Sequence, residues 1–184
     1  MVLPIVAFGD PVLKKVAQEI DAHYPKLKEV IANMFETMDS AHGVGLAAPQ
    51  VGLSIRLFLV DASPFAEDHP ELEGFRKIFL NPIILEESGK PWSFNEGCLS
   101  IPGIREDVMR KPEILIEYYD ENWVLHEERY DGLVARVIQH EYDHIEGILF
   151  IERLSGLRRR LLKGKLADIT RGFIDVDYRM RFPR

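Results

Sequence analysis

Cysteine is almost absent from this chain of 184 residues, which contains only Cys98. A single cysteine cannot form an intramolecular disulfide, so the fold is expected to stand without one and to suit a reducing compartment. No segment approaches the roughly 18 uninterrupted apolar residues of a membrane helix, and the N-terminus has no basic region typical of a signal peptide. These absences predict a cytoplasmic protein with no membrane partner.

Basic residues are also fewer than acidic ones: the chain has 23 Lys and Arg and 30 Asp and Glu, which gives a net charge of -7. This balance argues against a protein whose whole surface binds nucleic acid, so DNA is not expected as a partner. The C-terminal residues 151–184 differ, with ten basic and four acidic side chains. Such a basic end predicts an anionic partner, and the alternative is a helix face that simply contacts water.

Apolar residues make up 46% of the chain, enough to bury a sizeable core, and the length is that of one ordinary domain. No internal repeat and no linker divides the sequence. We therefore expect a single domain over residues 1–184, with a core at 1–150 and a basic helix plus a further strand at 151–184.

Hydrophobic periodicity predicts an α+β fold, with mixed or antiparallel strands around a central helix. A first helix is expected from Leu27 to about Met38, before Gly43. The central helix should follow Asp131, which can cap it, and end near Gly147. The other expected elements are strands at 55–60, 78–85, 113–119 and 123–130, a third helix from about residue 154, and a closing strand at 173–178.

The strongest chemical signal is the sequence His-Glu-Tyr-Asp-His at residues 140–144, within the predicted central helix. His140 and His144 are four residues apart and project from one helix face, so both rings can bind a single metal ion. Glu141 is then placed to handle the proton of a water molecule. The alternative is a pair of surface histidines on a polar stripe.

A third metal ligand is less obvious from the pattern. Phe150 occupies the position where metzincins have a third histidine, and Glu146 and Glu152 lie too near the second histidine to serve. Asp168 survives as a weak candidate. The upstream candidate is Cys98, expected in a loop between strands, which with two histidines would leave a fourth position open for water. A lone cysteine is otherwise a small buried apolar residue.

A glycine-rich stretch, Gly43–Gln50, follows the first predicted helix. It lacks the Gly-Lys-Ser/Thr ending of a phosphate-binding loop and follows a helix rather than a strand, so nucleotide binding is not expected. Its small residues would let a substrate backbone pass closely, and Gln50 offers an amide donor. A simple connecting turn is the alternative.

These three stretches together resemble a known family. Gly43–Gln50, Glu96–Ser100 and His140–His144 resemble, in order and spacing, the three signature motifs of peptide deformylase. The resemblance runs from Leu3 to about Phe150. It implies a metallohydrolase that removes the N-formyl group from the formylmethionine of newly made proteins and releases formate. Together with the single domain expected from length, this makes residues 1–184 one catalytic domain, with the three motifs in the core at 1–150.

The resemblance assigns the site residues. It implies a metal bound by Cys98, His140 and His144, with Fe(II) in the cell, although such a mixed site also accepts Zn(II), Ni(II) or Co(II). Glu141 becomes the catalytic acid and base, and Gln50 with the backbone N–H of Leu99 would hold the formyl oxygen. The positions that match the substrate-binding residues of the family are Val44, Gly45, Phe94, Arg105, Leu133 and Val137.

The resemblance also concerns surrounding residues and partners. Asp143 is expected to pair with Arg110 near Glu96, and Arg136 occupies a position that is often apolar in relatives. The partners implied are N-formyl-methionyl nascent peptides and, through the basic C-terminal segment, the ribosome. Two alternatives stay open: an endopeptidase of the His-Glu-x-x-His type, and a ribosome-associated module whose metal only stabilises the fold.

Overall fold

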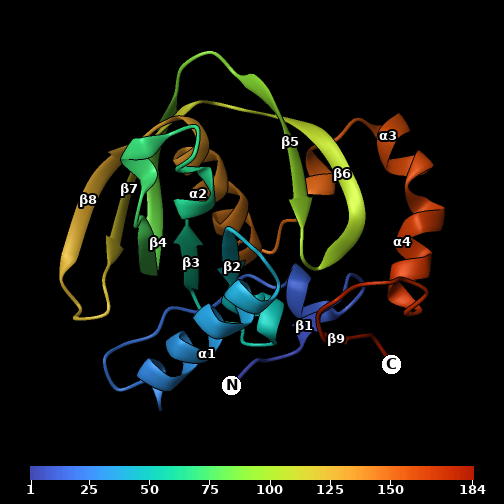
Figure 1. The fold of residues 1–184 in the computed structure, drawn as a ribbon, viewed down its shortest axis with the longest axis horizontal. Coiled ribbons are helices and arrows are strands. Elements are labelled where there is room, and N and C mark those ends of the chain that lie inside the picture. The colour runs from blue at the N-terminus through green and yellow to red at the C-terminus, as the bar shows by residue number, and fades with distance from the viewer.

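A computed structural model describes all residues from 1 to 184. Its main layer is a five-stranded antiparallel sheet in the order β2-β3-β4-β7-β8 (Figure 1). The strands are β2 (Gly45–Ala47), β3 (Leu57–Asp61), β4 (Arg76–Ser88), β7 (Glu113–Tyr119) and β8 (Leu125–Tyr130). β7 and β8 are joined by a short turn, whereas β4 and β7 are neighbours in the sheet although residues 89–112 separate them in the chain.

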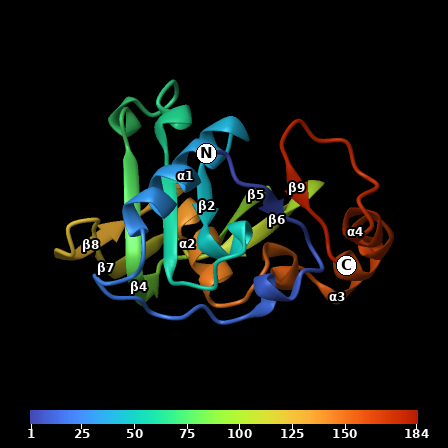
Figure 2. The ribbon, with the colours of Figure 1, turned by 90° about the horizontal axis from the view of Figure 1, so that it is seen from below.

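Two smaller sheets complete the strands. β5 (Trp92–Cys98) and β6 (Ile101–Arg110) form an antiparallel hairpin, and β1 (Ile5–Val6) pairs in parallel with β9 (Met180–Arg181). The β1–β9 pair joins the two ends of the chain. Figures 1 and 2 both place β8 at one end of the molecule and α4 at the other.

The helices are α1 (Leu27–Ser40), α2 (Gly132–Ile145), α3 (Gly156–Leu161) and α4 (Lys163–Thr170). Short 3-10 turns lie at Pro11–Lys14, Ala48–Val51, Ser63–Phe65, Pro70–Leu72 and Phe150–Arg153. None of the helices has the length and apolar character that a membrane span requires.

Helix α2 lies between the five-stranded sheet and the β5–β6 hairpin. Val134, Ala135 and Ile138 are buried against the sheet in a cluster that includes the stacked rings of Phe58 and Phe79, 4.9 Å apart. The opposite face of α2 is polar and forms hydrogen bonds to the hairpin. Every residue from Val134 to Glu141 is buried, so the polar side chains of this helix need partners inside the protein.

The expected α+β fold is confirmed, and so is an antiparallel arrangement of most strands. Two local expectations are wrong. Cys98 does not lie in a loop but is the last residue of β5. The closing strand is not at 173–178, which is irregular, but at Met180–Arg181. The alternation of residues 173–178 reflects a segment that is exposed and half-buried in turn, whereas the strand forms where β1 offers a free edge.

Helix ends also differ in detail. Asp131 is the N-cap of α2, as expected, but its side chain makes no capping hydrogen bond. The expected third helix begins at Gly156 because the Ser155 hydroxyl caps it by accepting a bond from the Arg158 N–H. Two helices, α3 and α4, replace the single one, and they meet at Leu162.

The turn after α2 generates a stability prediction. Gly147 has a φ of +73°, and a Cβ there would lie 2.7 Å from the backbone oxygen of Lys14. We expect Gly147→Ala to lower the free energy of unfolding by at least about 2 kcal/mol, because left-handed strain and a clash with backbone add together. Urea unfolding followed by circular dichroism measures this free energy of unfolding. The control is Gly164→Ala in α4, where nothing lies within 4 Å of the new Cβ and a small gain of up to about 1 kcal/mol is expected; equal effects would refute the argument.

Candidate metal centre

Three side chains converge at the buried end of the β5–β6 hairpin. The ligand atoms of Cys98, His140 and His144 lie within 4.8 Å of one another, and Cys98 Sγ is 3.4 Å from His144 Nε2. β5 supplies the cysteine, and the two histidines are one turn apart on α2. This clustering of a thiol with two imidazoles is the donor set that binds Zn(II), Fe(II), Co(II) or Ni(II) in proteins.

The surroundings of His140 fit a cation. Its Nδ1 lies 3.0 Å from Glu96 Oε1, which leaves the other ring nitrogen for a metal, as in most metal-binding histidines. Burial alone would lower the pKa of His140, but hydrogen bonds with Cys98 and Glu96 and the charge of Glu141 raise it well above its ordinary value. Groups that favour a proton on this ring also favour a metal ion beside it. The residues present therefore fit a divalent metal.

Glu96 is the centre of a buried ion-pair network. Its carboxylate accepts hydrogen bonds from Arg110 at 2.8 and 3.0 Å and from Arg136 at 2.9 Å. Burial alone would raise the pKa of the Glu96 carboxyl, but bonds from His140 and Arg110 hold it well below its usual range. A permanently ionised Glu96 fixes the orientation of the His140 ring.

Asp143 extends this network to the surface. It accepts from Arg110 at 2.9 Å, which is the pairing expected from the sequence, and from Arg153 at 2.6 Å through both carboxylate oxygens. Arg136, at the position that is often apolar in relatives, is only 2% exposed; it also donates to the carbonyls of Val108 and Trp92. The network ties α2 to both strands of the hairpin.

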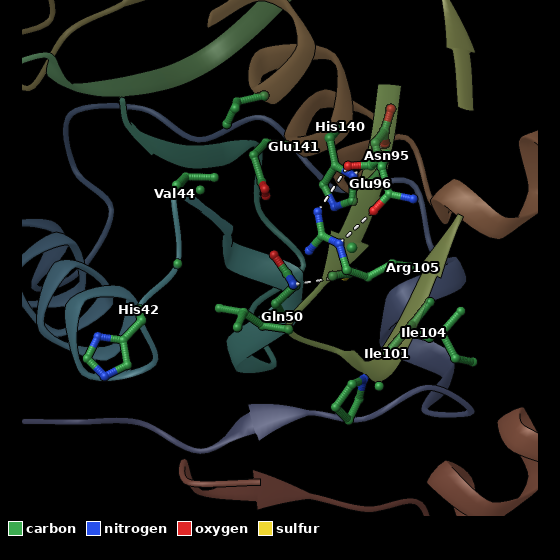
Figure 3. A pocket seen from close by; sticks show the side chains of 18 of the residues that line it. His42, Val44, Gln50, Asn95, Glu96, Ile101, Ile104, Arg105, His140 and Glu141 are labelled. Carbon is green, nitrogen blue, oxygen red and sulfur yellow. Dashed lines mark hydrogen bonds and ion pairs between the residues drawn. The ribbon is translucent and has the colours of Figure 1, made fainter. Parts of the chain in front are cut away.

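Glu141 lies beside the cluster, with its carboxylate facing the same space as Gln50 and His140 (Figure 3). The residue is 4% exposed, and its Oε2 has no hydrogen-bond partner. Burial raises the pKa of this carboxyl to about 7. Strand β2 approaches so closely that a Cβ on Gly45 would lie 2.6 Å from Glu141 Oε1. A side chain at position 45 would therefore displace the Glu141 carboxylate.

Two hydrogen-bond donors lie at the cluster. Gln50 Nε2 is 3.5 Å from Cys98 Sγ and 3.2 Å from Ser100 Oγ, and its Oε1 accepts from the Ala47 N–H at 3.0 Å. These contacts fix the direction of the amide. The backbone N–H of Leu99 makes no hydrogen bond within the protein, so it is free for a ligand.

A cavity of about 910 Å³ opens over the cluster, the size of a site for a small peptide or drug-sized ligand. Five of the residues predicted to contact substrate line it: Val44, Gly45, Phe94, Arg105 and Val137. The sixth, Leu133, does not line it, because it lies one helical turn before Val137 on α2. Asp168, the weak alternative ligand, is away from the cluster on α4 and pairs with Arg171.

Sequence reasoning missed one wall of this cavity. Residues 175–178, Asp-Val-Asp-Tyr, line it from the C-terminal segment. The only signal in the sequence is the apolar alternation of residues 173–178, which predicts a strand and not a cavity wall. Which cavity this segment borders depends on long-range packing that no local pattern records.

An α+β fold with a cysteine, two histidines and a neighbouring buried glutamate defines a metal-dependent hydrolase. Residues 2–160 match the family model of polypeptide deformylase, and the chain belongs to that family. It is 61% identical to a peptide deformylase of Christiangramia forsetii over 190 residues, covering 100% of this chain and 97% of the relative. A peptide deformylase of Flavobacterium johnsoniae is 57% identical, covering 99% and 96%.

Solved structures agree. The peptide deformylase of Plasmodium falciparum superimposes with a TM-score of 0.81 at 36% identity, covering 92% of this chain and 96% of that one. The enzyme of Legionella pneumophila gives 0.81 at 35% identity, covering 94% and 98%. The chain is therefore a hydrolase of a metal-dependent family that removes the N-formyl group from nascent peptides, as the sequence predicts. The comparisons support neither the endopeptidase nor the ribosome-associated module.

The close approach of β2 to α2 gives a testable prediction. We expect Gly45→Ala to push the Glu141 carboxylate aside and to lower kcat for a formyl-methionyl peptide by at least about a hundredfold, the usual scale of lost acid–base catalysis. Bound metal, measured by elemental analysis, should stay near one ion per chain, because no ligand is touched. Glu141→Gln is the matched comparison, and an active Gly45→Ala enzyme would contradict the argument.

Proposed function

We propose that Cys98, His140 and His144 bind one divalent metal ion, and that Glu141 performs acid–base catalysis in deformylation. The observation that supports this most directly is the Glu141 carboxylate, which is buried with one oxygen unpartnered in the cavity beside the three ligands. Leaving a buried carboxylate without a partner costs folding free energy. A purely structural metal site gains nothing from it, whereas a hydrolytic site requires a proton carrier there.

Each residue of the site then has its own role in deformylation. When bound, the metal supplies a Lewis acid that acidifies water and polarises a carbonyl group. Glu141 accepts the proton of the attacking water at Oε2 and returns it to the departing nitrogen, so that formate and a free amine leave. Glu96 keeps the His140 ring oriented. The Gln50 amide and the Leu99 N–H donate to the formyl oxygen, an interaction worth roughly 3 kcal/mol per donor in other enzymes.

The cavity walls hold the rest of the substrate. We assign the methionine side chain to the apolar surface of Val44, Phe94 and Val137, and the passing peptide backbone to Gly45 and Arg105. Leu133 matches another position of the family's methionine pocket, but it does not line the cavity. It would therefore support this apolar surface without contacting the methionine side chain. An unbranched apolar side chain suits such a surface, and an acidic one would lose its hydration without gaining a partner.

We propose Fe(II) as the metal in the cell. The support is the family resemblance together with a thiolate and two imidazoles, which accept iron as well as Zn(II), Ni(II) or Co(II). We further propose that the whole chain acts as one catalytic domain, because β9 pairs with β1 and residues 175–178 line the cavity. The enzyme would act in the cytoplasm, where nascent peptides emerge, with its basic C-terminal segment touching the ribosome.

The ligand and proton-carrier roles predict different losses. Cys98→Ser should lose most of its metal, because a neutral hydroxyl is a far poorer ligand than a thiolate. Glu141→Gln should keep the metal and lose turnover by at least about a hundredfold. Formate release from a formyl-methionyl peptide and elemental analysis measure the two effects. A Cys98→Ser protein with full metal and full activity would refute the ligand set, and absent formate release by the wild type would refute the function.

Metal identity predicts sensitivity to air. The Fe(II) form should lose activity in oxygen much faster than the Zn(II) form, because iron and its thiolate ligand both oxidise whereas zinc is redox-inert. The measurement compares half-lives of the two reconstituted forms, with an anaerobic sample of each as control. Equal half-lives would exclude iron–thiolate oxidation as the cause of decay.

The basic segment gives a separate prediction. Arg158 pairs with Glu106, so the cations left for an anionic partner include Arg159, Arg160 and Lys163. Changing these three to Gln should weaken co-sedimentation with ribosomes and flatten its salt dependence, while hydrolysis of a short formyl peptide stays the same. Unchanged co-sedimentation at low salt would favour the solvated-face interpretation.

A further inference from the structure

The C-terminal segment is held in place beside the turn that joins β5 to β6. Its start follows α4, where the Phe173 N–H donates to the Asp168 carbonyl at 2.8 Å. Its end pairs with β1 as strand β9, and in Figure 2 the red segment runs between these two anchors. Tyr178, shortly before β9, is half-buried and lines the cavity together with Leu99 of the turn. The segment therefore presents Tyr178 to that turn from a fixed position.

The turn consists of Leu99 and Ser100, between the last residue of β5 and the first of β6. The Ser100 carbonyl accepts from the Phe8 N–H at 2.9 Å, and the Ser100 hydroxyl lies 3.2 Å from the Gln50 amide nitrogen. No backbone N–H donates to the Leu99 carbonyl, so its donor is the Tyr178 hydroxyl, at 2.7 Å. The two ends of the chain thus hold the two carbonyls of this turn.

Tyr178 holds the same residue whose amide is free for a ligand. The Leu99 N–H makes no hydrogen bond within the protein, and only the two backbone dihedrals of Leu99 separate this N–H from the carbonyl that Tyr178 holds. The Leu99 side chain packs with the apolar cluster around α1 and β2. With the side chain and the carbonyl both held, the direction of the amide is restricted, and loss of the Tyr178 bond gives it more freedom.

We propose that Tyr178 is a positioning residue for deformylation, whose hydroxyl acts through the Leu99 carbonyl to keep the Leu99 N–H directed at the formyl oxygen. The inference rests on the proposed function, which takes this N–H as a donor to the oxygen. Such donors act because they are oriented before the reaction, and a misplacement of about 1 Å can cost about a hundredfold in rate. Negative charge develops on the oxygen only in the transition state, so the loss should fall on kcat rather than on KM.

The first test removes the hydroxyl and keeps the ring. For metal-loaded Tyr178→Phe acting on a formyl-Met-Ala peptide, we expect kcat to fall about tenfold and KM to change by less than about twofold. Bound metal, measured by elemental analysis, should equal that of the wild type, because no ligand is changed. An unchanged kcat would overturn the inference while leaving deformylation intact.

Tyr118→Phe is the matched control, because it removes a tyrosine hydroxyl that also donates within the protein. Its partner is Glu128 on the neighbouring strand β8, and Tyr118 does not line the cavity. Both variants should lose a similar free energy of unfolding, measured in urea, but only Tyr178→Phe should lose kcat. Equal losses of kcat in the two variants would show that lost stability is the cause, and would overturn the positioning role.

The Leu99 amide can be observed directly because Cys98 is the only cysteine of the chain. Protein labelled with carbonyl-¹³C cysteine and ¹⁵N leucine therefore gives one amide signal in an HNCO spectrum, recorded on the diamagnetic Zn(II) form. This signal should shift in Tyr178→Phe and stay in place in Tyr118→Phe. A lower kcat in Tyr178→Phe with an unshifted Leu99 signal would overturn the inference. Absence of formate release by the wild type would instead overturn the proposed function, and the inference with it.

Discussion

The buried carboxylate of Glu96 is the interaction on which the rest of the site depends. It accepts from Arg110 and Arg136 and orients His140, so one side chain joins the β5–β6 hairpin to α2. Burying these charges is costly, and a buried ion pair is worth little net stability unless its hydrogen bonds are nearly complete. Here both oxygens of Glu96 are used. What the network provides is a fixed geometry, because the strand that supplies Cys98 and the helix that supplies both histidines cannot move independently.

The same constraint explains why α2 is polar on a buried face. Its sheet-facing side is an ordinary apolar core, with Val134, Ala135 and Ile138 packed against the rings of Phe58 and Phe79. Its other side faces the hairpin, where an apolar surface would have packed equally well. Ionised and hydrogen-bonded groups stand there instead, and among them Glu96 and Glu141 raise the pKa of His140, whereas Arg110 lowers the pKa of His144. The sheet-facing side of α2 thus contributes apolar packing, and the hairpin-facing side contributes the polar groups of the site.

Backbone proximity is the second constraint on the site. β2 comes so close to α2 that a side chain at position 45 would displace the Glu141 carboxylate from its present position. This contact excludes water from one side of the carboxylate and raises its pKa. A metal ion bound at Cys98, His140 and His144 would lower that pKa again through its positive charge. In the proposed mechanism, the sheet and the metal would therefore jointly set the pKa of Glu141.

Much of this could be predicted from the sequence, because the signals are local. The spacing of His140 and His144 predicts that both rings lie on one face of a helix, and the three motifs predict the family. Hydrophobic periodicity located α1, α2 and four of the nine strands, β3, β4, β7 and β8, within a few residues. The structure brings Cys98 together with the two histidines, at the end of β5 rather than in the loop that the sequence predicts.

Tertiary structure alone decided which distant residues share a cavity. Residues 175–178 reach the site because β9 pairs with β1, which joins residues at opposite ends of the chain. Leu133 fell outside the cavity lining through a difference of one helical turn, which periodicity does not resolve. Arg136 became a third partner of Glu96 because hairpin and helix meet there. Local patterns report what a segment can form, whereas contacts across many residues depend on how all segments pack at once.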